Sequence, residues 1–268
     1  MVVTTVTNMK GGVGKSTLSM LLAKFIARTN PEIPVVVIDM DPQAGSTVLL
    51  NGTKKLESYT MTDILQAVYD NMYPNDIIYQ SFINITEVSP NLYLIPSNQS
   101  LVQFVSNGAP TILLGEAIRS IKEVIRQISE KAYIVIDTGN YGQLVTMGIE
   151  AADVVLIPMT LSQQTLKPSS ITITLALRSG KKLVGVVPSS IGDAKWEKIS
   201  IESVSKQIKS LPIAKNTDCK FYSGIPYSRY LIRGDWLRSG NIILPDKYCG
   251  LAEELLSDID SIDVLSGV

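Results

Sequence analysis

Histidine is absent from this chain of 268 residues. Imidazole is the usual proton carrier near neutral pH and a common metal ligand, so its absence excludes His-based acid–base catalysis and His-ligated metal sites. Any catalysis must therefore use carboxylates, lysine, hydroxyl groups or a bound ion.

Cysteine and long apolar runs are also scarce. The two cysteines, Cys219 and Cys249, form no C-x-x-C pair and no metal-ligand spacing, so a reducing, cytosolic setting is the simplest expectation. No apolar run reaches the length of a membrane span, and strand-forming residues begin within two positions of the N-terminus. We therefore expect neither a transmembrane helix nor a signal peptide.

The charge is unevenly distributed, although the chain as a whole carries a net charge of −1. The segment from Lys167 to Lys247 contains 14 Lys and Arg and 6 Asp and Glu. Concentrated basic residues favour a polyanionic partner, but a solvated lysine-rich surface gives the same pattern. Charge alone leaves both interpretations open.

The most informative stretch runs from Lys10 to Thr17 and reads Lys-Gly-Gly-Val-Gly-Lys-Ser-Thr. It follows a β-branched run at 2–7 and precedes residues 18–26, whose apolar side chains have helical spacing. Strand, glycine-rich turn and helix are the context that a phosphate-binding loop requires. Lys15 would contact the β- and γ-phosphates and Ser16 would ligate Mg²⁺, whereas the alternative is a glycine-rich turn that binds nothing.

A second lysine, Lys10, precedes the first glycine, where an ordinary phosphate-binding loop does not need one. In this feature the stretch resembles the deviant Walker A box of the ParA/MinD/nitrogenase-iron-protein superfamily. The resemblance implies that the extra lysine reaches across a dimer to the nucleotide of the partner. It also implies nucleotide contacts from the whole loop, which comprises Lys10, Gly11, Gly12, Val13, Gly14, Lys15, Ser16 and Thr17.

Two carboxylates follow the next buried strand, at 35–39, in the sequence Asp39-Met-Asp41-Pro-Gln43. Beyond the carboxyl end of a parallel strand they would face the crevice where ligands bind. The pattern resembles the second signature of ParA proteins, which implies that Asp41 positions the attacking water and that Asp39 lies near the Mg²⁺ shell. The alternative is a pair of exposed loop carboxylates.

A third signature is the strand at 133–138, which contains Asp137 and is similar to a Walker B segment. Asp137 is expected to hold Mg²⁺ through a water ligand. The family usually continues Asp-Thr-Pro-Pro, but here Gly139 and Asn140 replace the two prolines. Two flexible residues in place of two rigid ones put the coupling of this loop to dimerisation in question.

The remaining elements are predicted from periodicity and turn residues. We expect a short capped helix at 62–68, then a polar surface loop with one hairpin-like element, and a long amphipathic helix at 113–128. Further strands are expected at 92–98, 152–158 and 182–187, and helical patterns at 196–208, 229–238 and 251–259. By resemblance, Pro188 and Pro226 lie where relatives border the adenine.

These elements predict an α/β fold with a doubly wound, mainly parallel β-sheet flanked by helices. We expect residues 1–268 to form a single P-loop ATPase domain without an N-terminal DNA-binding extension.

The leading hypothesis is a ParA-like partition ATPase of the cytoplasm and nucleoid. By resemblance it uses ATP and Mg²⁺, forms a homodimer with ATP, binds double-stranded DNA non-specifically and is stimulated by a ParB-like protein. The basic residues expected to contact DNA are Lys195, Lys198, Lys206, Lys209, Arg229, Arg233 and Arg238.

Three alternatives remain open. A MinD-like spatial regulator would act on a membrane or protein scaffold, but the acidic last helix lacks the basic face for membrane docking. An electron-transfer ATPase like the nitrogenase iron protein needs cluster-binding cysteines. A small-molecule P-loop enzyme, such as a biotin-pathway synthetase, would not depend on Lys10.

Overall fold

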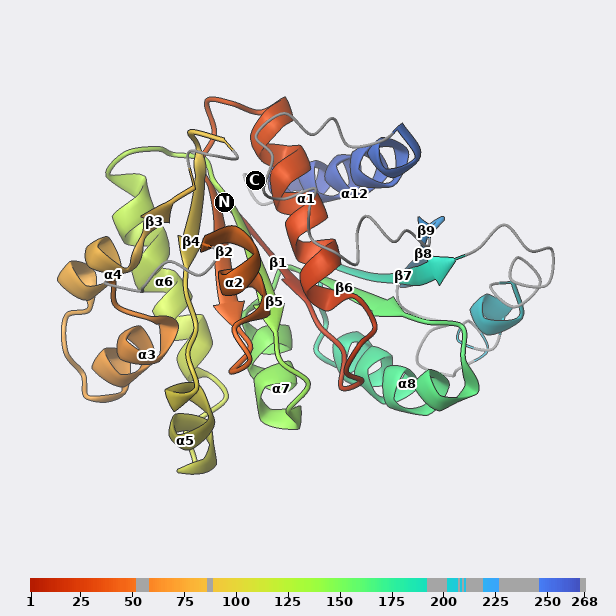
Figure 1. Cartoon of the computed structure of the whole chain (residues 1–268), viewed down its shortest axis with the longest axis horizontal. Coiled ribbons are helices and arrows are strands. Elements are labelled where there is room, and N and C mark those ends of the chain that lie inside the picture. Colours follow the sequence, from red (N-terminus) through yellow and green to blue (C-terminus); the bar gives the residue numbers. More distant parts are fainter. Residues whose placement is uncertain are drawn as a thin grey trace.

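The computed structural model describes residues 1–51, 58–85, 89–191, 202–206, 208, 210, 219–226 and 246–265. Helices cover both faces of a central sheet in this part of the chain (Figure 1). The strands are β1 (Val2–Val6), β2 (Val35–Met40), β3 (Ile83–Asn84), β4 (Leu92–Ile95), β5 (Tyr133–Thr138), β6 (Val154–Met159), β7 (Leu183–Ile191), β8 (Cys219–Phe221) and β9 (Ile225–Pro226).

The helices connect these strands and give the alternating β–α order. Those described are α1 (Lys15–Thr29), α2 (Gly45–Asn51), α3 (Met61–Tyr69), α4 (Asn75–Ser81), α5 (Ser100–Ser106), α6 (Leu113–Arg126), α7 (Gly142–Ala151), α8 (Gln163–Arg178) and α12 (Asp246–Leu265).

The strands lie in the order β3-β4-β2-β5-β1-β6-β7-β8, with β9 paired to β7. The pairs are parallel except β3 with β4, which is antiparallel. The predicted mainly parallel, doubly wound sheet is therefore confirmed. Strands β2, β5 and β1 are neighbours and run parallel. The loops that follow them therefore meet at the carboxyl ends of these strands.

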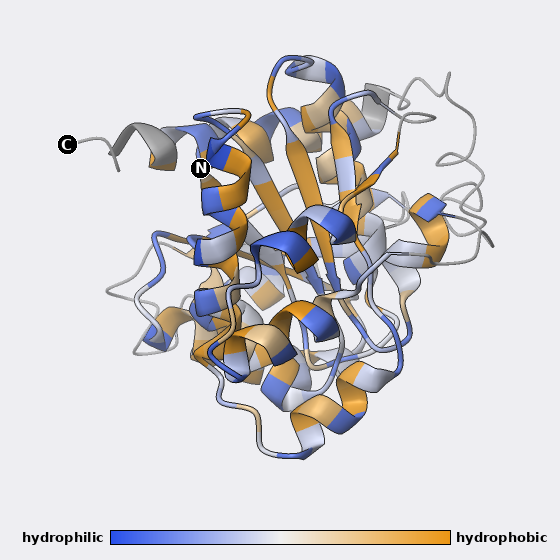
Figure 2. Cartoon of the chain, turned by 90° about the vertical axis from the view of Figure 1, so that its left-hand side faces the viewer, coloured by the Kyte–Doolittle hydropathy of each residue, from blue (hydrophilic) through white to orange (hydrophobic). Residues whose placement is uncertain are grey.

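Both faces of the sheet are buried, and successive residues of one strand supply opposite faces. In β2, Val37 belongs to the apolar cluster that includes residues of α1 and α12, whereas Val36 belongs to the cluster on the other face that includes residues of α3 and α6. Apolar colour runs along the central strands, and the hydrophilic colour lies mainly on the outer surfaces of the helices (Figure 2). Each fully buried Val, Leu or Ile contributes about 1.5–3 kcal/mol to this core.

Several local predictions can be compared with the structure. The helix at 62–68 and the amphipathic helix at 113–128 are confirmed as α3 and α6, and the hairpin-like element is the β3–β4 pair. The description of the stretch after α3 as surface loop was wrong, because it contains α4. The predicted helix at 229–238 and most of that at 196–208 lie outside the described residues.

Helix α7 packs unusually close to the sheet at Gly148. A Cβ atom there would lie 2.6 Å from Thr138 Cγ2 and 2.9 Å from Thr5 Cγ2. We expect Gly148→Ala to lower the free energy of unfolding by about 1–3 kcal/mol through overpacking, as measured by urea denaturation. The control is Gly115→Ala in α6, where no atom lies within 4 Å; it should stabilise the helix by about 0.5–1 kcal/mol. Equal effects of both substitutions would contradict the packing argument.

Candidate functional site

The loop between β1 and α1 has the backbone geometry of an anion cradle. Gly12 has a φ of +74° and Gly14 a φ of +90°, in the left-handed region that glycine adopts readily. Helix α1 has no acidic residue in its first turn and no side-chain cap on its N-terminus. Its first N–H groups and positive dipole end are thus left for an anionic ligand, as a bound phosphate requires.

The loop is held in shape by a buried asparagine that the sequence analysis did not single out. Asn8 is fully buried, and its Nδ2 donates to Pro158 O at 2.9 Å and to Ser169 Oγ at 2.8 Å. Its Oδ1 accepts from Lys10 N at 2.9 Å. On the other side of the loop, Ser189 Oγ donates to Val13 O at 2.6 Å. The cradle is therefore fixed to β6, β7 and α8.

The two lysines of the loop have different environments. Lys15 is only 7% exposed, and its Nζ donates to Lys10 O at 3.3 Å. Burial lowers the pKa of Lys15, and the carboxylates of Asp137 and Asp41 oppose that effect. The Lys10 side chain is half-buried and forms no ion pair with the described residues. One ammonium therefore points into the cradle region, while the other is available for an external partner.

Asp39 and Asp137 stand opposite each other on β2 and β5, and both are fully buried. Asp39 Oδ1 accepts from Asp41 N at 2.9 Å, and Asp39 Oδ2 accepts from Thr47 N at 2.7 Å and Thr47 Oγ1 at 2.8 Å. These bonds hold the chain from 41 to 47 in place. The carboxylate of Asp39 thus already has three donors, and its expected place near Mg²⁺ stays a prediction.

Asp137 is arranged differently, because one of its oxygens is not satisfied. Its Oδ2 accepts from Ser46 Oγ at 2.5 Å, and the Ser16 hydroxyl lies near this carboxylate. Its Oδ1 is buried without a hydrogen-bond partner. A buried carboxylate oxygen beside the Ser16 hydroxyl is a suitable pair of hard oxygen donors for Mg²⁺.

The described residues contain no cluster of three or more Asp, Glu, Cys or His that could hold a metal ion by itself. Mg²⁺ is commonly bound by one or two protein carboxylates together with substrate phosphates and water, and Asp137 and Ser16 supply such oxygen donors. The residues present therefore fit a cation that arrives with a nucleotide.

The loop of Asp41 lies against the loop that follows β5. Gln43 N donates to Asp41 Oδ1 at 2.9 Å, which turns the chain tightly after Pro42. A Cβ atom at Gly139 would lie 3.3 Å from Asp41 Oδ1 and 3.2 Å from Pro42 Cδ.

Gly139 also accounts for part of the departure from the Pro-Pro pattern. Its N–H donates to Met40 O at 3.0 Å, a bond that proline could not make. The residue is buried, whereas Asn140 is exposed. The first of the two flexible positions is thus anchored to β2, and the second faces solvent.

The buried pair makes the stability of the ligand-free protein depend on pH. Burial raises the pKa of Asp39 to about 7 and that of Asp137 to about 6. The unfolded chain loses these protons near pH 4, so the folded state binds more protons between about pH 4 and 7. We expect the free energy of unfolding to fall across this window, on the order of 2–4 kcal/mol, in urea titrations without Mg²⁺ or nucleotide.

The control for this prediction is Asp137→Asn, which removes one of the two titrating groups. Its pH dependence across the same window should be clearly shallower than that of the wild type. The prediction would be contradicted if the stability of the wild type did not fall between pH 4 and 7, or if it fell no more steeply than that of Asp137→Asn.

The other predicted site residues are placed as follows. Pro188 and Pro226 lie on β7 and β9, which pair next to Ser189 and hence near the cradle. Lys206 is exposed and pairs with Glu202 at 2.8 Å. The remaining residues proposed for DNA contact lie outside the described residues: Lys195, Lys198, Lys209, Arg229, Arg233 and Arg238.

A parallel sheet with an anion cradle after β1 and acidic residues at the ends of β2 and β5 defines the P-loop class of nucleotide-binding proteins. Within it, the family model AAA_31, described as an AAA domain, matches residues 1–177. The chain therefore belongs to this family of the ParA/MinD superfamily, as the sequence resemblance predicted.

Comparison with individual proteins gives relatives of the same kind. The chain is 33% identical over 156 residues to the sporulation initiation inhibitor protein Soj of Bacillus subtilis, covering 58% of this chain and 56% of Soj. It thus spans little more than half the length of that curated relative.

Two solved structures show the same fold over nearly the whole chain. Apo McdA of Cyanothece has a TM-score of 0.74 at 21% identity and covers 96% of this chain and 99% of its own. The plasmid partition protein BB_S35 of Borrelia burgdorferi, bound to AMPPNP, has a TM-score of 0.68 at 23% identity, with 99% and 98% covered. No helix among the described residues is both long and apolar enough to span a membrane.

Proposed function

We propose that this protein is a partition-type ATPase that hydrolyses ATP with Mg²⁺ and dimerises around the bound nucleotide. In the ATP state it binds double-stranded DNA without sequence preference, on the nucleoid in the cytoplasm. A ParB-like protein stimulates hydrolysis and so releases the ATPase from DNA. The family membership and the partition proteins among the neighbours support this proposal.

The single observation that carries the proposal is the contrast between Lys10 and Lys15. The main chain of Lys10 is held on both sides of its Cα: its N–H donates to Asn8 Oδ1, and its carbonyl oxygen accepts from Lys15 Nζ. Its ammonium has no ion pair within the described part of the chain. A cation held at the rim of a phosphate site, and not needed inside it, is suited to a nucleotide on a second subunit.

Each residue of the site would then have a separate role in binding or hydrolysing ATP. The loop from Gly11 to Thr17 holds the phosphates through its N–H groups, and Lys15 binds the phosphate oxygens. Ser16 and Asp137 hold Mg²⁺, which neutralises phosphate charge when bound. Asp41 orients the attacking water, and Lys10 stabilises the charge that develops on the partner's nucleotide.

The DNA-binding part of the proposal depends on sequence and on charge. The segment from Lys167 to Lys247 holds the excess of Lys and Arg. A dimer presents two such segments, so phosphate contacts double and the affinity should rise steeply when ATP closes the pair.

The test compares Lys10→Ala with the wild type in three nucleotide states: ATP, ADP and none. Wild type should bind a non-specific duplex in gel shifts only with ATP, and binding should weaken sharply with added salt. Lys10→Ala should retain ATP binding as a monomer but lose the ATP-dependent dimer in sedimentation, together with DNA binding and turnover.

Lys131→Ala, at an exposed position outside the site, is the matched control and should behave as the wild type. A normal ATP dimer with normal turnover in Lys10→Ala would point to an ordinary P-loop enzyme. Absence of DNA binding by the wild type at low salt would instead favour a regulator that uses another scaffold.

A further inference from the structure

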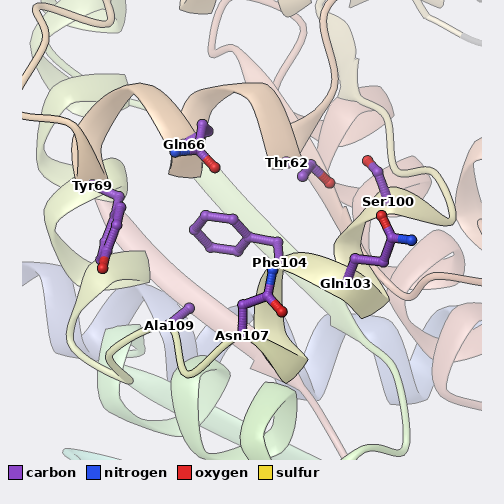
Figure 3. Close-up of a pocket in the computed structure, with 8 residues that line it drawn as sticks. All are labelled: Thr62, Gln66, Tyr69, Ser100, Gln103, Phe104, Asn107 and Ala109. Atoms are coloured by element: carbon purple, nitrogen blue, oxygen red, sulfur yellow. The ribbon is translucent and has the colours of Figure 1, made fainter.

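A pocket of about 330 Å³ opens on the surface between α3 and α5, away from the phosphate loop. Figure 3 shows Phe104 of α5 lying between the α3 side chains and the loop that carries Asn107 and Ala109. The nucleotide site described above does not use this pocket.

The walls of the pocket carry amide, hydroxyl and aromatic groups, with no charged side chain. The amides of Gln103 and Asn107 are exposed and have no hydrogen-bond partner within the described residues. Tyr69 and Phe104 meet edge to face, with ring centroids 6.3 Å apart, and Tyr69 is 54% exposed. Amides that both donate and accept match the peptide groups of a polypeptide, and exposed aromatic rings are enriched where proteins meet.

The charge of the segments that form the pocket indicates which kind of polypeptide would bind. All eight residues that line the pocket lie between Lys55 and Arg119, a stretch of sequence without Lys or Arg. Two carboxylates belong to the helix that forms one wall: Asp63 lies in α3, and Asp70 follows it directly and accepts a hydrogen bond from the pocket residue Gln66 at 2.9 Å. Such a field repels DNA and other polyanions and favours a segment that carries basic residues.

The pocket is also connected to the catalytic loops. Gln143 Nε2, in the first turn of α7, donates to Ala109 O at 2.5 Å. Helix α7 begins directly after the loop from Gly139 to Tyr141, and its Leu144 lies 3.3 Å from the Cβ position of Gly139. A ligand that displaces the 107–109 loop would therefore also shift the start of α7 and the adjoining loop at Gly139, which lies next to Asp41 and Asp137.

From this combination we infer that the α3–α5 pocket is a docking site for a basic, aromatic-containing polypeptide segment of a partner protein. Occupation of the pocket changes the rate of nucleotide release through the Ala109–Gln143 bond. The docking of a peptide is inferred from the residues of the pocket alone. The effect on nucleotide release also rests on the proposed ATPase function.

The experiment selects peptides from a random displayed library on the purified chain without nucleotide, and measures their affinity by fluorescence anisotropy. Selected peptides should carry net positive charge and at least one aromatic residue. Their affinity should fall about tenfold or more in the double variant Gln103→Lys with Asn107→Lys, because both lysines repel a basic segment inside the pocket.

The matched control is Gln80→Lys, an exposed position of α4 in the same basic-free stretch but outside the pocket. It should leave the affinity nearly unchanged. Neutral or acidic consensus peptides, or an equal loss of affinity in the control, would each overturn the inference.

The regulatory part is tested with Gln143→Ala. In the wild type, a bound peptide should change the dissociation rate of a fluorescent nucleotide analogue. In Gln143→Ala the peptide should bind as before without changing that rate. Peptide binding with no effect on the wild-type rate overturns the regulatory part, whereas failure of all nucleotide binding defeats the proposed function and leaves the docking result standing.

Discussion

Lys15→Ala is expected to lower the affinity for Mg²⁺-ATP by about 100-fold or more. Hydrogen bonds to charged groups are each worth about 1.5–3 kcal/mol, and this ammonium would serve two phosphates in a site shielded from water. Burial disfavours the charged form of Lys15 and lowers its pKa. Its removal should therefore leave the fold intact, and the loss should appear in binding and not in stability.

Isothermal titration calorimetry measures the effect, and thermal melting of the ligand-free protein checks folding. Lys10→Ala is the matched control, because it removes a lysine from the same loop but should preserve the affinity of the monomer for ATP. Wild-type affinity in Lys15→Ala would remove the P-loop assignment altogether.

Asp41→Ala should reduce ATP hydrolysis by about 10²- to 10³-fold, with ATP affinity and dimerisation preserved. Orientation and general-base assistance of the attacking water act mainly in the transition state, so their loss lowers turnover more than binding. The phosphate cradle of α1 does not involve Asp41 and should still bind the nucleotide. Single-turnover measurements on preformed ATP complexes separate the chemical step from binding.

The structure provides a sharper control at the same position. Asp41 Oδ1 accepts from Gln43 N and thereby holds the turn. Asp41→Asn keeps an oxygen acceptor for that bond but removes the charge, so it should be nearly as slow as Asp41→Ala if the carboxylate acts on water. Near-normal turnover in Asp41→Asn would show that the turn, not the charge, matters. Normal turnover in both variants would mean that another residue orients the water, and Asp39 would be the first candidate.

Much of the site framework could be predicted because its signals are local. The glycines and lysines of the phosphate loop occur at fixed spacing between a strand and a helix, and the strands before Asp39 and Asp137 are buried on both faces. Such patterns depend on the backbone geometry of a few consecutive residues, so they can be recognised in the sequence. The mainly parallel sheet followed from the alternation of strands and helices.

The rest depends on contacts between distant segments. Asn8 bonds to β6 and α8, and Ser189 bonds to the phosphate loop from the end of β7. A buried asparagine beside a glycine-rich loop has no periodicity that would single it out. Helix α4, of seven residues, was missed for the same reason: it packs against α6, and a run this short shows little periodicity.

The anchoring of the phosphate loop by Asn8 also affects the kinetics of nucleotide entry. The loop is already ordered by bonds to three other elements, so the entropy of fixing it is lost when the chain folds and not when a ligand arrives. A nucleotide would meet a preformed cradle, and its association would be limited by diffusion and charge. Its residence time would then depend on how quickly the surrounding loops of Asp41 and Gly139 separate.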